Sequence, residues 1–163
     1  MEYNLEPISS ADREQIIDIF NYYVENTFAA YPEVRVPYNF FDIIMGMSHG
    51  YPTVVAKDKS GNVLGFGMLR PYNPMPAFSS VAELTCFISL THTRAGLGTA
   101  ILEHLISNAK KKEIRTILAN ISSRNTGSIA FHERQGFKKC GCFREIGRKR
   151  GEPFDVIWMQ KMI

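Results

Sequence analysis

The sequence lacks the long hydrophobic run that a membrane-spanning protein requires. No apolar stretch among its 163 residues approaches the roughly 18 residues of a membrane span. The first residues, Met1 to Pro7, include two glutamates where a secretory signal would carry positive charge before an apolar run. We therefore expect a cytoplasmic protein without membrane attachment.

Cysteine is scarce, and neither cysteine nor histidine is spaced for a metal. The chain has three cysteines, an odd number, and Cys140 and Cys142 stand closer together than the usual zinc-binding pair. The four histidines do not fall at metal-ligand spacing either. We expect no disulfide framework and no bound metal. Cys86 has apolar neighbours and is expected to pack as a small hydrophobe rather than to act as a nucleophile.

A large excess of one charge is missing too. Lysine and arginine total 19 and aspartate and glutamate 16, so the formal net charge of +3 is too small to indicate a nucleic-acid-binding protein. The basic cluster Arg148-Lys149-Arg150 is short and has no interleaved aromatic residues. We expect this cluster to form a solvated turn, with contact to an anionic substrate or partner as the alternative. Nucleic acid is therefore not an expected partner.

What the sequence does contain is an ordinary globular balance, with 45% hydrophobic and 21% charged residues. No linker or repeat interrupts it, so we expect one domain over residues 1–163. Apolar patterning predicts helices from about residue 11 and over residues 39–47, 96–111 and 126–135. It predicts strands over residues 3–8, 53–57, 63–70, 81–88, 116–121, 138–146 and 154–161. This order indicates a mixed α/β sheet with helices packed on its faces.

The most informative segment joins the strand over residues 81–88 to the helix over residues 96–111. Gly96 and Gly98 lie in the turn, where glycines let backbone amides approach an anion and the helix N-terminus favours its charge. Arg94 adds a positive charge suited to a phosphate. The spacing is neither a Walker loop nor a dinucleotide fingerprint, since Ile101 occupies the place of the third glycine. Taken alone, the pattern fits a plain tight turn equally well.

A second segment favours the anion-binding interpretation, because both segments match one family. Residues 93–98, Thr-Arg-Ala-Gly-Leu-Gly, match the pyrophosphate loop Gln/Arg-x-x-Gly-x-Gly/Ala except at Thr93. Residues 125–137 match the pattern Asn-x-x-Ser/Ala-x-x-x-Tyr/His-Glu-x-x-Gly-Phe. In this order and at this distance, the two motifs resemble the GCN5-related N-acetyltransferase (GNAT) superfamily. The likeness covers nearly the whole chain and is closest to the phosphinothricin N-acetyltransferase-like branch.

The resemblance implies a fold, a reaction and a set of cofactor contacts. The fold is the GNAT fold, an α/β fold with a mixed, mostly antiparallel central sheet, a splayed central strand and helices on both faces. The reaction is transfer of acetyl from acetyl-CoA to the primary amine of a small molecule, an amino acid or analogue, by direct attack in a ternary complex. Family precedent also implies a homodimer. The expected acetyl-CoA contacts are Phe87, Ile88, Arg94, Gly96, Leu97, Gly98, Thr99, Asn125, Ser128 and His132.

Two residues are expected to take part in proton transfer. Acyl transfer to an amine requires removal of the ammonium proton, and the resemblance implies that Glu83 is the base. The alternative is an ordinary strand-edge acid in an ion pair. His132 stands where the family carries a tyrosine or histidine, and a proton donor there could meet the coenzyme thiolate as it leaves. A neutral surface histidine is the competing interpretation.

Three further roles are open in the same way. Asn125 binds pantetheine, caps the last helix, or does both. Ser128 is a cofactor contact or a helix-surface residue rather than a nucleophile, because no partner for a catalytic serine is evident. Tyr31, Arg35 and Phe78 are candidate walls of the acceptor pocket beside Glu83.

On the acceptor side the sequence departs from the branch that it resembles. Met75 and Phe78 stand where an Arg-x-x-Tyr motif is usual, and Pro32 and Pro153 replace an arginine and a tryptophan. The identity of the acceptor amine therefore stays open. A protein N-terminal or lysine acetyltransferase and a non-catalytic acyl-CoA-binding module are the alternative functions.

Overall fold

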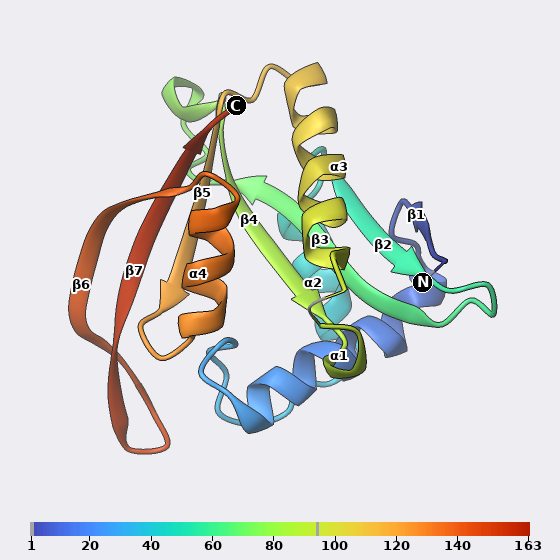
Figure 1. The fold of residues 1–163 in the computed structure, drawn as a ribbon, viewed down its shortest axis with the longest axis horizontal. Coiled ribbons are helices and arrows are strands. Elements are labelled where there is room, and N and C mark those ends of the chain that lie inside the picture. The colour runs from blue at the N-terminus through green and yellow to red at the C-terminus, as the bar shows by residue number, and fades with distance from the viewer. Residues whose placement is uncertain (1, 94) are drawn as a thin grey trace.

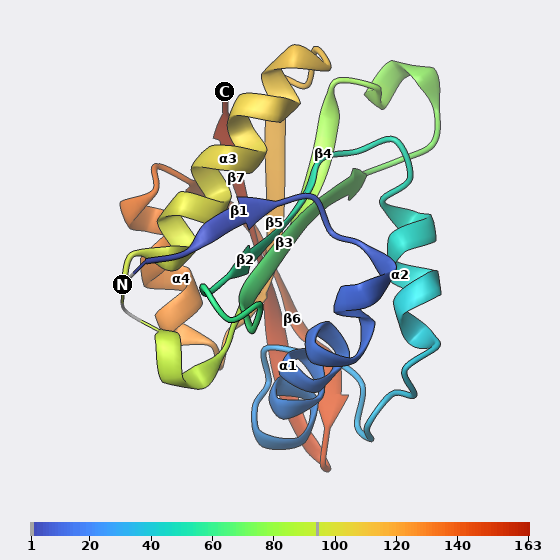
Figure 2. The ribbon, with the colours of Figure 1, turned by 90° about the vertical axis from the view of Figure 1, so that its right-hand side faces the viewer.

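The computed structural model describes residues 2–93 and 95–163 and contains a seven-stranded sheet with helices on both faces (Figures 1 and 2). The strands follow the order β1-β2-β3-β4-β5-β7-β6. Among the described residues, β4 and β5 form the one parallel pair, and the other neighbours are antiparallel. The predicted mixed, mostly antiparallel sheet with helices on both faces is confirmed.

The bounds of most elements lie close to the predicted ones. The strands are β1 (Asn4–Glu6), β2 (Thr53–Lys57), β3 (Val63–Pro71), β4 (Val81–Ile88), β5 (Thr116–Ser122), β6 (Lys138–Lys149) and β7 (Glu152–Met162). The helices are α1 (Arg13–Asn26), α2 (Phe40–Met47), α3 (Leu97–Lys111) and α4 (Thr126–Arg134). None of the helices in the described part of the chain is long and apolar enough to cross a membrane.

The two parallel strands stay together over only part of their length. Val81, Ala82 and Glu83 of β4 pair with residues of β5, and no pairing continues beyond Glu83. β4 itself runs on to Ile88, paired all the way with β3. The two strands therefore part in a V, which opens downward in Figure 1. The predicted splayed central strand is confirmed.

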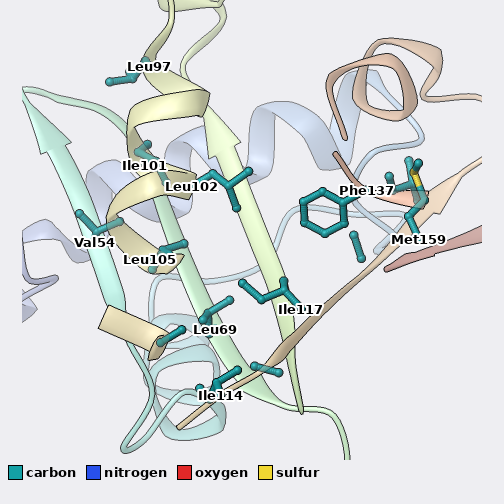
Figure 3. Packing of buried hydrophobic residues seen from close by; sticks show 14 of the residues in the cluster. Val54, Leu69, Leu97, Ile101, Leu102, Leu105, Ile114, Ile117, Phe137 and Met159 are labelled. Atoms are coloured by element: carbon teal, nitrogen blue, oxygen red, sulfur yellow. The ribbon is translucent and has the colours of Figure 1, made fainter. Parts of the chain in front are cut away.

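One face of the sheet is covered by α3, which packs by its aliphatic side chains. Leu97, Ile101 and Leu105 recur at helical spacing and are at most 1% exposed. Figure 3 shows them against the strands that carry Val54 and Leu69. The helix lies so close to β3 that a Cβ at Gly67 would come within 3.0 Å of the Leu105 side chain. This face forms the larger of the two cores.

The opposite face is covered by α1 and α2, as Figure 2 shows. α1 follows a capping box in which the backbone N–H of Ser9 donates to Asp12 at 2.9 Å. The two helices are joined by a bidentate Arg13–Asp42 ion pair at 2.8 Å. Their apolar residues pack against an aromatic-rich stretch of β3 and β4. This second core contains Ile16, Ile17, Phe41, Phe66 and Met68 among its buried residues.

The β6–β7 hairpin differs from the prediction. β6 continues to Lys149, so the turn is confined to Arg150 and Gly151, both at positive φ. Lys149 is fully buried, and its Nζ donates to the backbone carbonyls of Val24, Thr27 and Ala30 at 2.7 Å each. These carbonyls lie at the C-terminal end of α1 and just beyond it, where helical partners run out. The expectation of a solvated turn is therefore wrong for Lys149.

Candidate active site

The edge of β4 that faces β5 carries unpaired backbone groups beyond Glu83. The N–H of Ser89 donates to the carbonyl of Leu64 at 2.8 Å, and in an antiparallel pair every second residue bonds to the partner strand. The amides of Leu84, Cys86 and Ile88 therefore point away from β3, toward the space that β5 has left. One acceptor there is used, since the Tyr23 hydroxyl donates to the carbonyl of Ile88 at 2.6 Å. The rest can bind a ligand that itself carries amide groups.

Phe87 is another expected cofactor contact, but its backbone N–H and C=O point toward β3, where it pairs with Phe66. Its ring packs on the α1 side, 5.3 Å from the ring of Phe20 and 5.1 Å from that of Tyr23. Its contact with a cofactor stays a prediction. Burial raises the pKa of the neighbouring Cys86 thiol to about 12, so this thiol is protonated and the expectation of a packed, unreactive cysteine agrees with its surroundings.

The glycine turn lies at the open end of the V. Gly96 precedes α3 with a φ of 79°, a conformation that favours glycine, and its surroundings are open. The first N–H groups of α3 have no helical partner and are available to an anion. A Cβ at Gly98 would come within 3.3 Å of the Phe131 ring, so α3 and α4 meet here.

The other expected contacts in this segment differ in what they offer. Leu97 is 1% exposed and packs in the core, so only its backbone is available. The Thr99 hydroxyl accepts a hydrogen bond from Gln135 at 2.9 Å. Arg94 lies outside the described residues, and its contact with the cofactor stays a prediction.

α4 brings together the three residues expected from the second motif. The side chain of Asn125 caps the helix by accepting from the N–H of Ser128 at 3.2 Å. His132 is 7% exposed, with Nδ1 2.8 Å from the Ser128 carbonyl and its ring between those of Phe131 and Phe137. Burial lowers the pKa of His132, so the ring is neutral and its Nδ1–H donates to that carbonyl.

This geometry bears on the predicted role of His132. A neutral ring that carries its proton on Nδ1 has none on Nε2 to give away. The ring would have to gain a proton before it could protonate a thiolate. Its role as an acid stays a prediction, and the competing interpretation is changed, because the histidine is buried rather than at the surface.

Glu83 lies on the other side of the sheet, at the point where β4 and β5 part. It is 8% exposed, and its carboxylate has a donor on each oxygen. Asn120 of β5 donates from Nδ2 to Oε1 at 2.6 Å, and Arg70 of β3 approaches Oε2 at 3.3 Å. The ion pair of the alternative interpretation is therefore present. The role of Glu83 as the base stays a prediction, and its position at the apex of the V is compatible with that role.

Tyr31 joins Glu83 through Asn120. Its hydroxyl donates to Asn120 Oδ1 at 2.9 Å, which leaves the amide nitrogen directed at Glu83. Burial and the charge of Glu83 raise the pKa of Tyr31 to about 12, so the phenol is protonated at neutral pH and acts as a donor. Its ring stacks on Phe154 with centroids 5.6 Å apart. The chain Tyr31–Asn120–Glu83 fixes the orientation of the carboxylate.

The two other candidate pocket walls have different surroundings. Phe78 is 5.7 Å from the ring of Tyr72, which is 6.3 Å from that of Trp158. Trp158 pairs with Asn120 across β5 and β7, so these aromatic rings border the Glu83 face. Arg35 instead forms ion pairs with two acidic side chains of α1, Glu25 at 3.0 Å and Asp18 at 3.5 Å. The structure does not bring Arg35 together with Glu83.

Sequence reasoning missed Asn120, Arg70, Tyr72 and Trp158. For Asn120 a signal exists, because an amide interrupts the apolar run over residues 117–121 and needs a hydrogen-bond partner. Arg70 offers a weaker one, at the end of the apolar run of β3. In the described residues, no group of three or more His, Cys, Asp or Glu side chains could hold a metal ion.

Comparisons with known proteins found a family model and relatives that cover nearly the whole chain. Residues 5–158 match the model of the acetyltransferase (GNAT) domain. The chain is 31% identical to an L-methionine sulfoximine/L-methionine sulfone acetyltransferase of Pseudomonas aeruginosa, over 98% of this chain and 94% of that protein.

Two solved structures have closely similar folds. A phosphinothricin acetyltransferase from Sinorhizobium meliloti in complex with acetyl-CoA superimposes with a TM-score of 0.93 at 27% identity, over 100% of this chain and 89% of the other. A ribosomal-protein-alanine N-acetyltransferase from Brucella melitensis does so with a TM-score of 0.90 at 30% identity, over 98% and 99%.

Proposed function

The chain belongs to the GNAT acetyltransferase family, and from that premise we propose that it transfers the acetyl group of acetyl-CoA to the primary amine of an amino acid or amino-acid analogue. GNAT acetyltransferases use acetyl-CoA, so this cofactor is confirmed. Relatives named for methionine sulfoximine, methionine sulfone and phosphinothricin support an acceptor of this class. The observation that carries the proposal is the Glu83 carboxylate, held by Asn120 and Arg70 where β4 leaves β5.

The residues around the V fit acetyl-CoA. The unpaired backbone amides of β4 at Leu84, Cys86 and Ile88 match the amide groups of a pantetheine arm. The left-handed Gly96 and the first N–H groups of α3 suit a pyrophosphate. When bound, acetyl-CoA supplies an acetyl thioester to the site.

Glu83 performs the proton transfer in this proposal. An acceptor amine reaches the site as an ammonium and must lose a proton before its nitrogen can attack a carbonyl carbon. Glu83 Oε2 takes that proton directly or through a water, while Asn120 and Tyr31 hold the carboxylate in place. The attack would be direct, within a ternary complex: the amine nitrogen would bond to the acetyl carbon, the C–S bond would break, and the next proton lost by the nitrogen would neutralise the departing coenzyme A thiolate. The buried Cys86 thiol, with its pKa raised to about 12, offers no nucleophile for a covalent route.

A screen of thiol release from acetyl-CoA tests the function. The candidate acceptors are amino acids, L-methionine sulfone, phosphinothricin, polyamines and short peptides with free N-termini. We expect saturable release with at least one amino acid or analogue. Release with peptides alone would instead make the chain a protein N-acetyltransferase, the activity named for the Brucella structure. Acetyl-CoA binding without release to any amine would make it a binding module.

The cofactor site has a test of its own in a pair of variants that are matched in size and differ in charge. Gly98→Glu and Gly98→Gln add the same bulk next to Phe131, but only the first adds negative charge beside the expected pyrophosphate. At about a hundredfold above its Kd, acetyl-CoA should stabilise the wild-type protein by about 2.7 kcal/mol, visible as a higher melting temperature. This rise in melting temperature should be lost in Gly98→Glu and should be larger in Gly98→Gln than in Gly98→Glu. Equal shifts in both folded variants would contradict the assignment of the glycine turn.

The assembly and location are part of the same proposal. We propose that residues 1–163 act as one domain, that the protein is cytoplasmic, where acetyl-CoA is available, and that it forms a homodimer. The edge strand β6 supports the dimer, because it exposes Phe143 at 54% and Ile146 at 60%. Sedimentation should give twice the chain mass of 18.5 kDa. A monomer at micromolar concentration would contradict it.

A further inference from the structure

A small cavity lies on the Glu83 side of the sheet, enclosed by α1, α2, β3 and β4. Its volume is about 40 Å³. The apolar part of its wall consists of Phe20, Ile44, Met47, Phe66 and Met68, and the polar part of Ser48, Arg70 and Thr85. A space of this size accommodates one compact group of a few heavy atoms rather than a whole ligand.

Two residues of this wall each have a polar side-chain atom without a hydrogen-bond partner. These atoms are Oγ of Ser48 and Nε of Arg70, both buried. Ser48 as a residue is only 2% exposed. Buried donors are satisfied in nearly all native structures, and leaving one unpaired costs free energy. Because Ser48 and Arg70 line the same cavity, their unpaired donors are the reason to place the acceptor atoms of a bound group there.

Arg70 also connects the cavity with the base. Its Nη2 lies 3.3 Å from Glu83 Oε2, and the residue is also part of the cavity wall. The side chain is 31% exposed, so the guanidinium is reachable from solvent. Among the described residues, Arg70 is the one cation that forms an ion pair with Glu83. Arg70 therefore stands next to both the Glu83 carboxylate and the small cavity.

The charges of this arrangement complement a zwitterion. The carboxylate of an α-amino acid can accept hydrogen bonds from Arg70 and Ser48, and bidentate pairing with a guanidinium suits its planar shape. Only one carbon separates that carboxylate from the ammonium, so the ammonium then lies beside Glu83. Each charge of the Arg70–Glu83 pair meets an opposite charge of the acceptor. A simple monoamine would leave the guanidinium edge and Ser48 unpaired.

We propose that this cavity is the carboxylate subsite of the acceptor site, that Arg70 is the residue that selects α-amino acids over other primary amines, and that Ser48 assists it. This inference rests on the proposed function and adds the residues that would recognise the carboxylate of the acceptor. It also provides a cation for the acceptor site, because Met75, 62% exposed, offers no charge where the branch that the sequence resembles usually has an arginine.

The test compares an amino acid with the amine that remains when its carboxylate is removed. The probes are L-methionine sulfone and 3-(methylsulfonyl)propylamine, each with saturating acetyl-CoA. Wild-type protein should favour the amino acid by about 10- to 100-fold in kcat/KM, the usual value of hydrogen bonds to a charged group. Arg70→Gln should bring this ratio close to one, mainly by raising KM for the amino acid.

Three further variants test which groups determine the ratio of kcat/KM between the amino acid and the amine. Arg70→Lys keeps the charge but not the planar fork and should give an intermediate ratio. Ser48→Ala should lower the ratio several-fold. The exposed Ser79→Ala, outside the cavity, should leave the ratio unchanged. Because loss of Arg70 also affects its partner Glu83, a fall in rate that is equal for both probes would overturn the subsite.

Binding separates this inference from the proposed function. If neither probe releases thiol, the proposed function is at fault for these amines, and calorimetry with coenzyme A-bound protein then decides the subsite. L-methionine sulfone should bind wild-type protein at least tenfold more tightly than Arg70→Gln. Equal affinity, no binding to either protein, or cavity density from water alone in a crystal soaked with the amino acid would overturn it.

Discussion

The two faces of the sheet are built from the same strands but differ in what they bury. Beneath α3 the buried side chains are aliphatic, such as Ile101 and Leu105, both fully buried. Beneath α1 and α2 the buried cluster adds Phe41, Phe66 and Met68 to its aliphatic residues. The same face of the sheet carries the hydrogen-bonded Glu83, Asn120 and Arg70, and two buried polar atoms there lack partners. Unpaired buried polar groups lower the stability of a fold. Their presence on the Glu83 face therefore indicates that function, rather than stability, has determined the residues there.

β4 shows how one strand serves both purposes. Its side chains alternate, so Ala82 and Leu84 contact the α3 core while Glu83 and Thr85 lie on the opposite face of the sheet. Its free backbone edge, between the two faces, is directed into the V. A donor held along that edge and an acceptor on the Glu83 face can therefore meet at the apex. The following substitutions test this division of labour.

Glu83→Gln should have the greatest effect of the substitutions, and it should lower turnover without weakening acetyl-CoA binding. The amide keeps the size of the side chain but cannot accept a proton from the ammonium. Turnover should fall by about 10²–10⁴-fold, the usual contribution of a general base, while acetyl-CoA affinity stays close to that of the wild type. Steady-state kinetics and calorimetry measure the two quantities.

A surface acid supplies the control for this variant. Glu103→Gln, on the α3 side and exposed, should leave turnover unchanged. Wild-type turnover in Glu83→Gln, with an unaltered pH profile, would reduce Glu83 to a structural ion-pair partner and assign the base to another group or to water.

Leu105→Ala should show the opposite behaviour on the α3 face. The side chain is fully buried, so its removal leaves a cavity and should lower the free energy of unfolding by about 2–5 kcal/mol. Urea unfolding measures this loss. Turnover well below the melting temperature should stay within about threefold of the wild type, since additive effects are expected for distant, independent sites. A selective loss of turnover in a folded Leu105→Ala protein would contradict the separation of the two faces.

Tyr31→Phe should have a modest effect on the Glu83 face. It removes one hydrogen bond to Asn120, usually worth about 0.5–1.5 kcal/mol, so turnover should fall by about two- to tenfold. The same change in an Asn120→Ala background should have almost no further effect, because the hydroxyl acts through that amide. Additive losses in this double-mutant cycle would show that Tyr31 acts on the acceptor independently of Asn120.

His132→Gln should have the smallest effect, on the pH dependence of stability. Burial places the pKa of His132 below its ordinary 6.5 in the folded chain. As the pH falls through 6.5, the histidine of the unfolded chain binds a proton while the folded ring stays neutral, so the free energy of unfolding decreases. The slope is at most about 1.4 kcal/mol per pH unit and should be missing from the variant.

Unfolding by urea between pH 5 and pH 8 measures this slope, with the exposed His49→Gln as the control. Turnover decides the other predicted role of His132. A loss of turnover in His132→Gln that grows toward high pH would establish it as the proton donor and contradict a purely structural histidine.

Local sequence patterns were sufficient for much of the fold. The apolar spacing of α3, the alternation in the strands and the paired glycines at 96 and 98 all act over a few residues, so they can be read directly. Glu83 was found because its segment resembles a family, and it lies where β4 and β5 part.

The missed features depend on contacts between distant segments. Asn120 meets Glu83 only because β5 pairs in parallel with the first part of β4, and no local pattern specifies that register. Arg70 faces Glu83 across the β3–β4 pair for the same reason. Lys149 belongs to a run of charges that indicates solvent, yet the hairpin carries it to the end of α1. Arg35 was expected in the pocket, but acidic residues of α1 hold it elsewhere.

A crystal structure with coenzyme A and an N-acetylated amino acid bound together would test this division between the two sides of β4. The coenzyme should lie in the V between β4 and β5, with its pyrophosphate at the Gly96–Gly98 turn. The acetylated nitrogen should lie within hydrogen-bonding reach of Glu83, directly or through one water, and the carboxylate should lie on Arg70. A product bound on the α3 side, or with its nitrogen remote from Glu83, would contradict the account.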